Sequence, residues 1–434
     1  MTSSNISDPL SAQSLDQRPT NSPVHIQHLS DLPPYPFPRM RALLEGITPQ
    51  DEGSALNMSI GEPQHQPAQF ILDALTQQQH LYNKYPPLAG HALWQEAVLK
   101  WLQRRNNIPD TFMTADHILP LNGSREGIFS LGLVIRDHYN MQSHKQHFVL
   151  PNPYYQPYSG TALIGQGDIL YLNALRENNF YPDYSALSEE QLTQTKALFI
   201  CNPSNPHGTI ASREMLIDLM IKAKHHDFIL IGDECYSEIY DQEAPISLIE
   251  LAYDLSQHHP DFKQNPLKNI IVFNSLSKRS NLAGLRSGFI AGDGEILARF
   301  KHMRQYSGAP LPLPIQLASA KAWSDEEHVI HNRALYHQKF DLAEQYLQGH
   351  LGFYRPQGGF CLWLDVSQGR FNSGEEACKA LWQQWGIKSL PGLYLSYEAN
   401  PQAPLNEAHL YIRLVLVHDN AQIEPALEKI VKTL

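Results

Sequence analysis

Lys278 stands where a lysine can do chemistry, just after an apolar run with the composition of a buried strand, Ile270-Ile-Val-Phe-Asn-Ser275. A lysine at the end of a strand can form a Schiff base with an aldehyde cofactor. Ser275 lies three residues before Lys278 and Arg286 lies eight residues after it, so a hydroxyl and a guanidinium could bind one phosphate together. Taken alone, a lysine after a strand more often belongs to a solvated basic loop, so further residues have to decide between the two interpretations.

Two more polar clusters follow apolar runs elsewhere in the chain. Asn205 lies in the turn Asn205-Pro-His-Gly208 after one such run, and Asp233 directly follows another, with Tyr236 three residues on. In open α/β sheets, ligands bind at the carboxyl ends of the strands. We therefore expect Asn205, Asp233 and Lys278 to share one pocket.

The elements that must position these residues alternate along the chain from about residue 90. Apolar runs predict strands at residues 147–150, 169–172, 197–201, 228–231, 270–274 and 288–291. Apolar residues at helical spacing predict helices from about His91 and over residues 212–226, and another helix begins at Ser124. This alternation is typical of a mostly parallel sheet. Further strands at 359–366 and 410–417, after a helix-rich region, predict a second domain.

Composition bounds the class of protein. With 434 residues, 42% of them hydrophobic, the chain can build a large core, and its length suggests roughly two to three domains. The 33 basic and 44 acidic residues give a net charge of −11 without a sustained basic run, which argues against nucleic acid or an anionic membrane surface as partner. No apolar stretch approaches the roughly 20 residues of a membrane span, and the first residues lack the apolar core of a signal peptide, so we expect a cytoplasmic protein.

Cysteine and histidine give no sign of a metal site. Cys201, Cys235, Cys361 and Cys378 lack metal-ligand or redox spacing, and three of them lie in apolar segments where cysteine behaves as a small hydrophobe. The histidine pairs fall in polar stretches without carboxylate partners at ligand spacing. We expect reduced, buried thiols and no metal.

The order and spacing of the motifs resemble the class I/II pyridoxal-phosphate aminotransferases of fold type I over nearly the whole chain. The motifs that carry the resemblance are Asn205-Pro-His-Gly208, Asp233-x-x-Tyr236, Ser275-Leu-Ser-Lys278 and Gly284-Leu-Arg286-Ser-Gly288. The segments 34–44, 233–240 and 277–281 are more specifically similar to the succinyldiaminopimelate aminotransferases of the bacterial lysine pathway. The resemblance implies an α/β fold, in which a large domain with a mostly parallel seven-stranded sheet is flanked by helices and joined to a smaller α/β C-terminal domain.

The expected division of the chain has four parts. Residues 1–31 are polar and lack apolar periodicity, so we expect a disordered extension. Residues 32–60 form an arm that joins the small domain, 61–308 form the large cofactor-binding domain, and 309–434 form the small domain.

The resemblance assigns roles around the pyridine ring of pyridoxal phosphate. The cofactor withdraws electrons only while its ring nitrogen stays protonated, and Asp233 at a buried strand end is the candidate carboxylate for that proton. The alternative, a turn or helix-cap aspartate, fits poorly because an unpaired buried charge is unfavourable. Tyr236 and Asn205 would bind the phenolic oxygen, Tyr155 would stack on the ring, and Lys278 would act as the general base.

The same resemblance places the phosphate and the partner subunit. Ser124 and Arg125 follow Gly123 at a loop-to-helix junction whose free N–H groups can bind an anion, and Ser275 and Arg286 complete the cup. Glycine and serine at a helix start are by themselves more often an ordinary N-cap. Tyr85 matches the tyrosine that family members send across a homodimer interface to the phosphate; the alternative is an exposed loop tyrosine.

Arg413 lies among β-branched neighbours in a predicted strand, where a charged side chain requires a partner. It matches the family arginine that binds the substrate α-carboxylate, with Gly61 and Asn205 beside it. A distal substrate carboxylate could bind Arg39, Lys84, Arg279 or Arg304, and the sequence does not rank them.

The implied activity is a ping-pong amino transfer between amino acids and keto acids, with glutamate and 2-oxoglutarate as one pair and N-succinyl-LL-2,6-diaminopimelate as the other amino donor. Three alternatives remain. The first is another aminotransferase of the family, acting on aspartate, an aromatic amino acid or N-acetylornithine. The second is a pyridoxal-phosphate C–S lyase, and the third is a cofactor-binding regulator, for which the first thirty residues are too short and polar to hold a helix-turn-helix.

Overall fold

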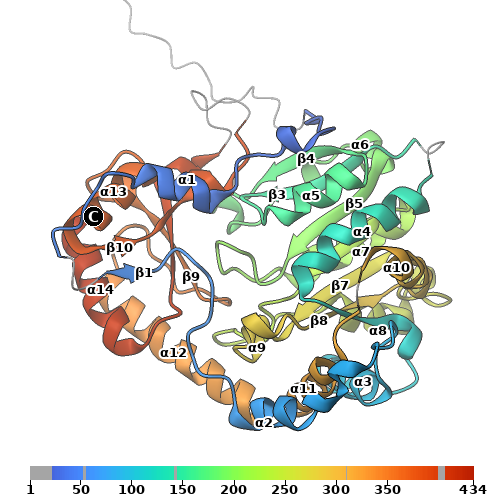
Figure 1. Cartoon of the computed structure of the whole chain (residues 1–434). Coiled ribbons are helices and arrows are strands. Elements are labelled where there is room, and N and C mark those ends of the chain that lie inside the picture. The colour runs from blue at the N-terminus through green and yellow to red at the C-terminus, as the bar shows by residue number, and fades with distance from the viewer. Residues whose placement is uncertain (1–21, 52–54, 141–143, 309, 399–405) are drawn as a thin grey trace, which may run out of the picture.

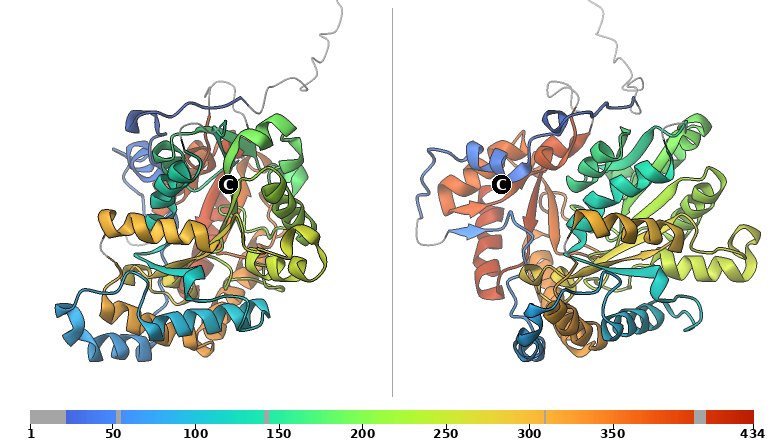
Figure 2. Two further views of the ribbon diagram at one scale, coloured as in Figure 1. Left: turned by 90° about the vertical axis from the view of Figure 1, so that its right-hand side faces the viewer. Right: turned by 45° about the vertical axis from the view of Figure 1, so that its right-hand side comes forward.

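The computed structural model describes residues 22–51, 55–140, 144–308, 310–398 and 406–434. The chain forms a large unit around a seven-stranded sheet and a smaller unit around a three-stranded sheet, and the long helix α12 (Glu327–Leu347) extends between them (Figure 1). The C-terminal residues, drawn red, belong to the smaller unit (Figure 2).

The seven-stranded sheet has the order β2-β8-β7-β6-β5-β3-β4. Its strands are β2 (Ile118–Leu121), β3 (His147–Asn152), β4 (Asp168–Asn173), β5 (Thr195–Cys201), β6 (Ile229–Asp233), β7 (Ile270–Ser275) and β8 (Gly288–Gly292). Neighbouring strands are parallel except where β8 pairs with β7 and β2. The predicted α/β fold with a mostly parallel sheet is confirmed. Only β2 has no counterpart among the strands read from the sequence, since it is four residues long and contains Pro120.

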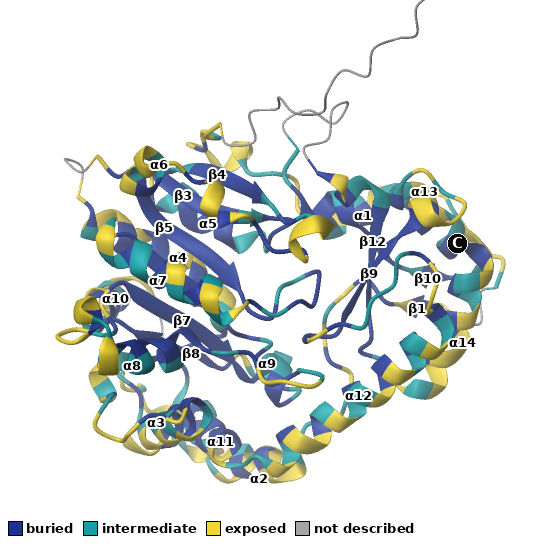
Figure 3. Ribbon diagram, turned by 180° about the vertical axis from the view of Figure 1, so that it is seen from behind, coloured by how far each residue is buried: buried dark blue, intermediate teal, exposed yellow. Residues whose placement is uncertain are grey.

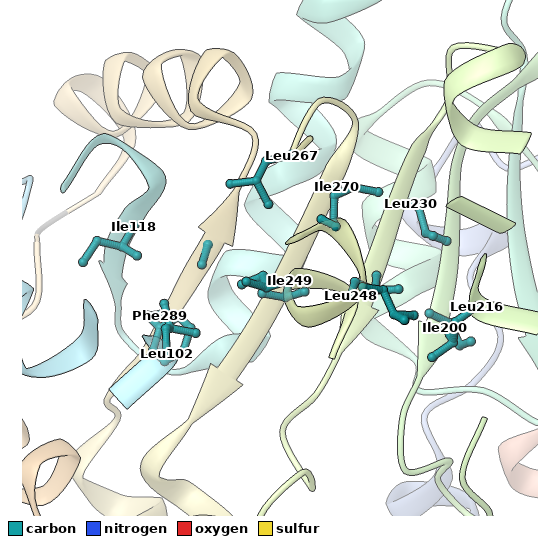
Figure 4. Close-up of a cluster of buried hydrophobic side chains, with 14 of the residues drawn as sticks. Leu102, Ile118, Ile200, Leu216, Leu230, Leu248, Ile249, Leu267, Ile270 and Phe289 are labelled. Carbon is teal, nitrogen blue, oxygen red and sulfur yellow. The ribbon is translucent and has the colours of Figure 1, made fainter. Parts of the chain in front are cut away.

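Helices cover both faces of this sheet because its side chains alternate between the two. One face packs against α4 (Ser124–His138), α5 (Pro157–Ile164) and α10 (Gly294–Ser307). The other face packs against α3 (Ala92–Asn106), α7 (Arg213–His225), α8 (Leu248–His258) and α11 (Leu313–Ser324). In β5, Phe199 enters the first core and Ile200 the second, and Figure 4 shows the second core around Ile200, Leu230 and Phe289.

The smaller unit has its own core. Its antiparallel sheet has the order β11-β12-β9, with β9 (Cys361–Asp365), β11 (Leu390–Pro391) and β12 (Tyr411–Val415). Helices α12, α13 (Gly374–Trp385) and α14 (Asn420–Thr433) pack around it, and the inner side of α12 is buried while its outer side is exposed (Figure 3). The arm contributes α1 (Pro36–Leu43) and β1 (Leu56–Asn57), which pairs with β10 (Ile387–Lys388).

Two observations bear on the predicted division of the chain, which stays a proposal. Most of the predicted extension, residues 1–21, lies outside the described residues, but Val24 forms a β-bridge with Ile169 and Ile26 is buried. Residues 22–31 are therefore attached rather than disordered, because they cover the open edge of β4. Helix α11 contributes Trp323 to the large core, so we propose that the small unit begins in α12 instead of at residue 309.

No helix in the described part of the chain is long and apolar enough to span a membrane. Within the same residues, no group of three or more His, Cys, Asp or Glu side chains is arranged to hold a metal ion.

Candidate active site

Two adjoining cavities, of about 1040 and 180 Å³, lie at the carboxyl ends of β5, β6 and β7. Both are lined by Tyr35, Ile60, Gly61, Ser124, Arg125, Tyr155, Gln156, Cys235 and Lys278. The larger cavity adds Ser275 and Arg286, and the smaller adds Asn205, Asp233, Tyr236 and Arg413. The structure thus brings together every residue that the sequence assigned to the site except Tyr85.

Lys278 is carried by α9 (Leu276–Arg279), a single turn that starts directly after β7. Its ammonium donates to the carbonyl oxygen of Gly61 and lies 5.2 Å from the centre of the Phe360 ring. Burial lowers the pKa of Lys278 to about 8, and the positive charge of Arg413 acts in the same direction. At pH 7 about a tenth of this amine is therefore unprotonated, far more than for an ordinary lysine, and able to act as a nucleophile or base.

Asp233 ends β6 and is only 5% exposed. Tyr158 donates its hydroxyl to one carboxylate oxygen at 2.8 Å, and the N–H of Cys235 donates to the other at 3.3 Å. Burial raises the pKa of Asp233, while these hydrogen bonds oppose the shift. No lysine, arginine or histidine among the described residues forms an ion pair with Asp233, so a protonated ring nitrogen would supply the missing positive partner.

Arg413 is buried in β12 and points toward the same cavity. Its guanidinium donates to Asn205 Oδ1 at 3.2 Å and to the carbonyl oxygen of Ser59 at 2.8 Å. Its Nε atom is buried without a hydrogen-bond partner, and no carboxylate pairs with it among the residues described. A buried guanidinium with neutral partners is a receptor for a carboxylate.

The opposite end of the site is shaped for an anion. Helix α4 starts at Ser124, and its N-cap residue, Gly123, has no side chain that could cap the first N–H groups. Gly123 has a φ of +81°, and a Cβ atom there would lie 2.2 Å from the guanidinium of Arg286, so only glycine fits. The helix terminus, Arg286 and Ser275 together fit a phosphate. Ser275 also caps α9, since its hydroxyl accepts from the N–H of Ser277 at 3.1 Å.

Tyr155 and Arg125 lie between the two ends. The Arg125 side chain donates to the Tyr155 hydroxyl at 2.7 Å, and the Tyr155 ring meets the ring of Tyr158 edge-on at 5.6 Å. Burial raises the pKa of Tyr155 to about 12, so its hydroxyl stays protonated. With a carboxylate for the ring nitrogen and an anion site for the phosphate, the residues present fit pyridoxal phosphate.

Tyr85 is fully exposed, at 102% of its reference area, and lines neither cavity. The structure also separates the candidates for a distal carboxylate. Arg279 is buried against Glu326, and Arg304 is buried against Glu126; both are unavailable to a substrate. Arg39 packs over the Tyr394 ring at 3.9 Å.

Sequence reasoning missed three residues of the site: Tyr158, Cys235 and Phe360. Tyr158 lies three residues after Tyr155, the predicted stacking residue, but its hydrogen bond to Asp233 spans 75 positions and has no local signal. Phe360 precedes β9 and reaches Lys278 from the smaller unit, which no local pattern could indicate.

Comparison with known proteins agrees with this geometry. The family model for aminotransferase class I and II matches residues 54–430. An LL-diaminopimelate aminotransferase of Dehalococcoides mccartyi is 26% identical over 93% of this chain and 97% of its own. The crystal structure of an aminotransferase from Neisseria meningitidis is 38% identical, with a TM-score of 0.84 over 93% of this chain and 98% of that one. Aminotransferase AspB from Helicobacter pylori is 36% identical, with a TM-score of 0.81 over 92% and 98%.

The match covers both units and all three strand ends of the site. The chain belongs to the class I and II aminotransferases, the pyridoxal-phosphate enzymes of fold type I.

Proposed function

We propose that this aminotransferase transfers an amino group between a diaminopimelate derivative and the glutamate/2-oxoglutarate pair, using Lys278 as its catalytic lysine. The observation that carries the proposal is the convergence of Lys278, Asp233 and Arg413 on adjoining cavities at one sheet edge. Each is a buried or half-buried ionisable group that forms no ion pair within the described chain, as expected of groups whose partners are ligands.

Pyridoxal phosphate, when bound, supplies an acceptor for the electron pair that remains after a substrate Cα–H bond breaks. Asp233 would hold the proton at the ring nitrogen, with Tyr158 fixing the carboxylate in place. In the first half of the ping-pong cycle, Lys278 Nζ would remove the proton from Cα of the amino donor and pass it to the bound cofactor; in the second half it would move a proton in the opposite direction. A pKa of about 8 is well matched to this role near neutral pH. Tyr236 and Asn205 would bind the phenolic oxygen.

Arg413 would bind the α-carboxylate of each substrate. Because Asn205 and Ser59 hold its guanidinium from two sides, an incoming carboxylate meets a preoriented group. Gly61 supports this arrangement, since a Cβ atom there would lie 3.1 Å from the Phe360 ring. Fixing the carboxylate fixes the direction of the Cα–H bond relative to Lys278.

The distal part of the substrate is proposed to occupy the larger cavity, which extends past Lys278 to Leu32 and Phe129. A cavity of about 1040 Å³ exceeds the needs of a phosphate group and a small amino acid together. Arg125, which the resemblance assigned to the phosphate, lines it without a carboxylate partner among the described residues. We propose it instead for the distal carboxylate, in preference to Arg39, Arg279 and Arg304, whose side chains are engaged elsewhere.

We favour N-succinyl-LL-2,6-diaminopimelate as the amino donor and 2-oxoglutarate as the acceptor, because segments such as residues 233–240 resemble the succinyldiaminopimelate aminotransferases. The second candidate is LL-2,6-diaminopimelate itself. Several relatives named LL-diaminopimelate aminotransferase match most of the chain at 25–26% identity, which supports this alternative.

A homodimer is part of the proposal. Tyr85 is a wholly exposed aromatic side chain on the loop before α3, and exposed Leu93 lies close to it in sequence. A partner subunit would bury Tyr85 and bring its hydroxyl to the phosphate end of the other site.

The test compares amino donors in parallel, with 2-oxoglutarate as acceptor and glutamate formation as readout. We expect kcat/KM for the succinylated donor to exceed that for LL-2,6-diaminopimelate by at least about tenfold; the reverse order would favour the second candidate. Turnover of aspartate or an aromatic amino acid alone would refute the diaminopimelate class. Arg125→Gln should raise KM for donors with a distal carboxylate and leave KM for alanine unchanged, whereas Lys278→Ala should abolish all transfer.

A further inference from the structure

The turn that carries Lys278 is short and needs support at its C-terminal end. Within α9, Leu276 O accepts hydrogen bonds from the N–H groups of Ser280 at 3.1 Å and Leu282 at 3.3 Å. The last carbonyl groups of a helix have no partner within the helix. Here the carbonyl oxygens of Lys278 and Arg279 accept from one side-chain amide, that of Asn332, at 3.2 and 3.4 Å.

Asn332 belongs to α12 and is 3% exposed. Both polar atoms of its side-chain amide form hydrogen bonds. Nδ2 donates to the two carbonyl groups of α9. Oδ1 lies 2.8 Å from His65 Nδ1 and accepts from Asn281 Nδ2 at 3.1 Å. Asn332 lines neither cavity of the site. It can act on Lys278 only through the main chain of α9.

His65 is held in turn by Lys339, another residue of α12, whose Nζ atom meets His65 Nε2. An ammonium group can only donate, so Nε2 must accept and the ring hydrogen must lie on Nδ1, which donates to Asn332. Burial lowers the pKa of both His65 and Lys339, and the Lys339 charge lowers that of His65 further, which keeps the imidazole neutral. The hydrogen bonds therefore run in one direction, from Lys339 through His65 and Asn332 to the carbonyl of Lys278.

This chain of bonds connects the two units. Asn332 lies in the half of α12 beside the large unit, where His328 also bonds Ser280 at 2.8 Å, and Tyr336 and Phe340 further along α12 enter the small core. Figures 1 and 3 both show α12 extending from the neighbourhood of α2 (Gln69–Gln77) and α11 to α14. The segment 61–65 contacts Lys278 a second time, through the bond from its ammonium to Gly61.

We propose that Asn332 is a positioning residue for Lys278: it caps α9, is oriented by His65 and Lys339, and so fixes the lysine relative to α12. The inference rests on the proposed catalytic role of Lys278. A reacting amine misplaced by about 1 Å loses much of its rate, so a cap on a one-turn helix has a kinetic effect although it touches no substrate.

The test uses the full chain with Asn332→Asp, which keeps an acceptor for His65 and Asn281 but removes the donor to α9. In the cofactor-free protein, hydrogen exchange at the N–H groups of Ser280 and Leu282 should become at least about tenfold faster. In the holoenzyme, the rate at saturating glutamate should fall at least about tenfold while KM stays within about twofold, because Asn332 does not contact the substrate.

His65→Phe is a milder second variant, since it keeps a ring against Tyr336, 4.9 Å away, but cannot donate to Asn332. It should accelerate the same exchange by about threefold. The matched control is Asn269→Asp. Asn269 is a buried asparagine that precedes β7, at the strand end opposite Lys278. Its side-chain amide also donates to a main-chain carbonyl, that of Ala223. The control should lower the melting temperature without changing exchange at Ser280 and Leu282 or the rate at saturating glutamate.

Exchange within twofold of wild type in folded Asn332→Asp and His65→Phe proteins would overturn the proposal, as would faster exchange with an unchanged rate. Failure of the underlying assignment is distinguishable. If Lys278→Ala retains full activity, the proposed function falls, while the exchange measurement still reports on the α9 cap alone.

Discussion

Lys278 should destabilise the folded, cofactor-free protein, and replacing it should make the protein more stable. Lys278→Met keeps the length and apolar character of the side chain but removes the charge. Burial lowers the pKa of Lys278 from its ordinary value of 10.5 to about 8. The unfolded chain therefore binds this proton more tightly than the folded protein does, which at pH 7 corresponds to roughly 3 kcal/mol of lost stability.

The hydrogen bond from Lys278 to the carbonyl oxygen of Gly61 offsets part of this loss, by about 1 kcal/mol. We expect Lys278→Met to be more stable than the wild type by roughly 2 kcal/mol at pH 7. A lowered pKa makes the folded state gain stability as the pH rises from about 8 to 10.5, so the advantage of the variant should shrink to roughly zero at pH 10.

The assay is urea unfolding of both cofactor-free proteins at pH 7 and pH 10. Other lysines titrate in this range, but they are common to both proteins and cancel in the difference. Lys100→Met is the control, because Lys100 is exposed and pairs only with Glu96 on α3; its effect should stay below about 0.5 kcal/mol. A variant that is less stable than the wild type at pH 7, or a difference that does not change between the two pH values, would refute the reasoning.

Three further predictions concern residues of the site and its support. Burial raises the pKa of Glu234 from 4.5 to about 7, so the wild type should lose up to roughly 3 kcal/mol of stability as the pH rises from 4.5 to 7. Glu234→Gln should not show this loss, and melting temperatures of both proteins at pH 5 and pH 8 test the difference. Arg413→Lys should raise KM for glutamate by at least about tenfold, measured in steady state, because lysine cannot bind Asn205 and Ser59 while also pairing with a carboxylate. Tyr85→Phe should leave the melting temperature of the cofactor-free protein unchanged but release bound cofactor several-fold faster on dilution; an unchanged release rate would count against the dimer proposal.

Most residues that the sequence assigned to the site lie together in the structure because the central ones follow strand ends. Apolar runs end where strands end, so the positions of Asn205, Asp233 and Lys278 could be read without any knowledge of the packing. That these strands are neighbours follows from the alternation of strands and helices, since parallel strands in such folds align their carboxyl ends. Residues that depend on local pattern were therefore predictable.

Residues that depend on distant pairing were not. The sequence left Arg304 as a candidate for binding the substrate because it could not show that Arg304 is already paired. Its partner, Glu126, lies 178 positions away, and no local feature reveals a bond of that range. The attachment of residues 22–31 was missed for the same reason, as it depends on a backbone bridge from Val24 to Ile169 and on the burial of Ile26 within a polar segment. Polar composition predicts disorder until a specific edge accepts the segment.

The charges of the site explain why ligand binding should stabilise this fold. Among the described residues, Asp233 is buried without an ion pair, Arg413 is buried with only neutral acceptors, and the Lys278 amine is desolvated beside Arg413. Each of these states is unfavourable in the chain alone, because buried charges require opposite partners. A ring nitrogen for Asp233, a carboxylate for Arg413 and a covalent bond for Lys278 would relieve all three at once. A cofactor and a substrate that supply these groups would therefore bind the folded chain and raise its stability.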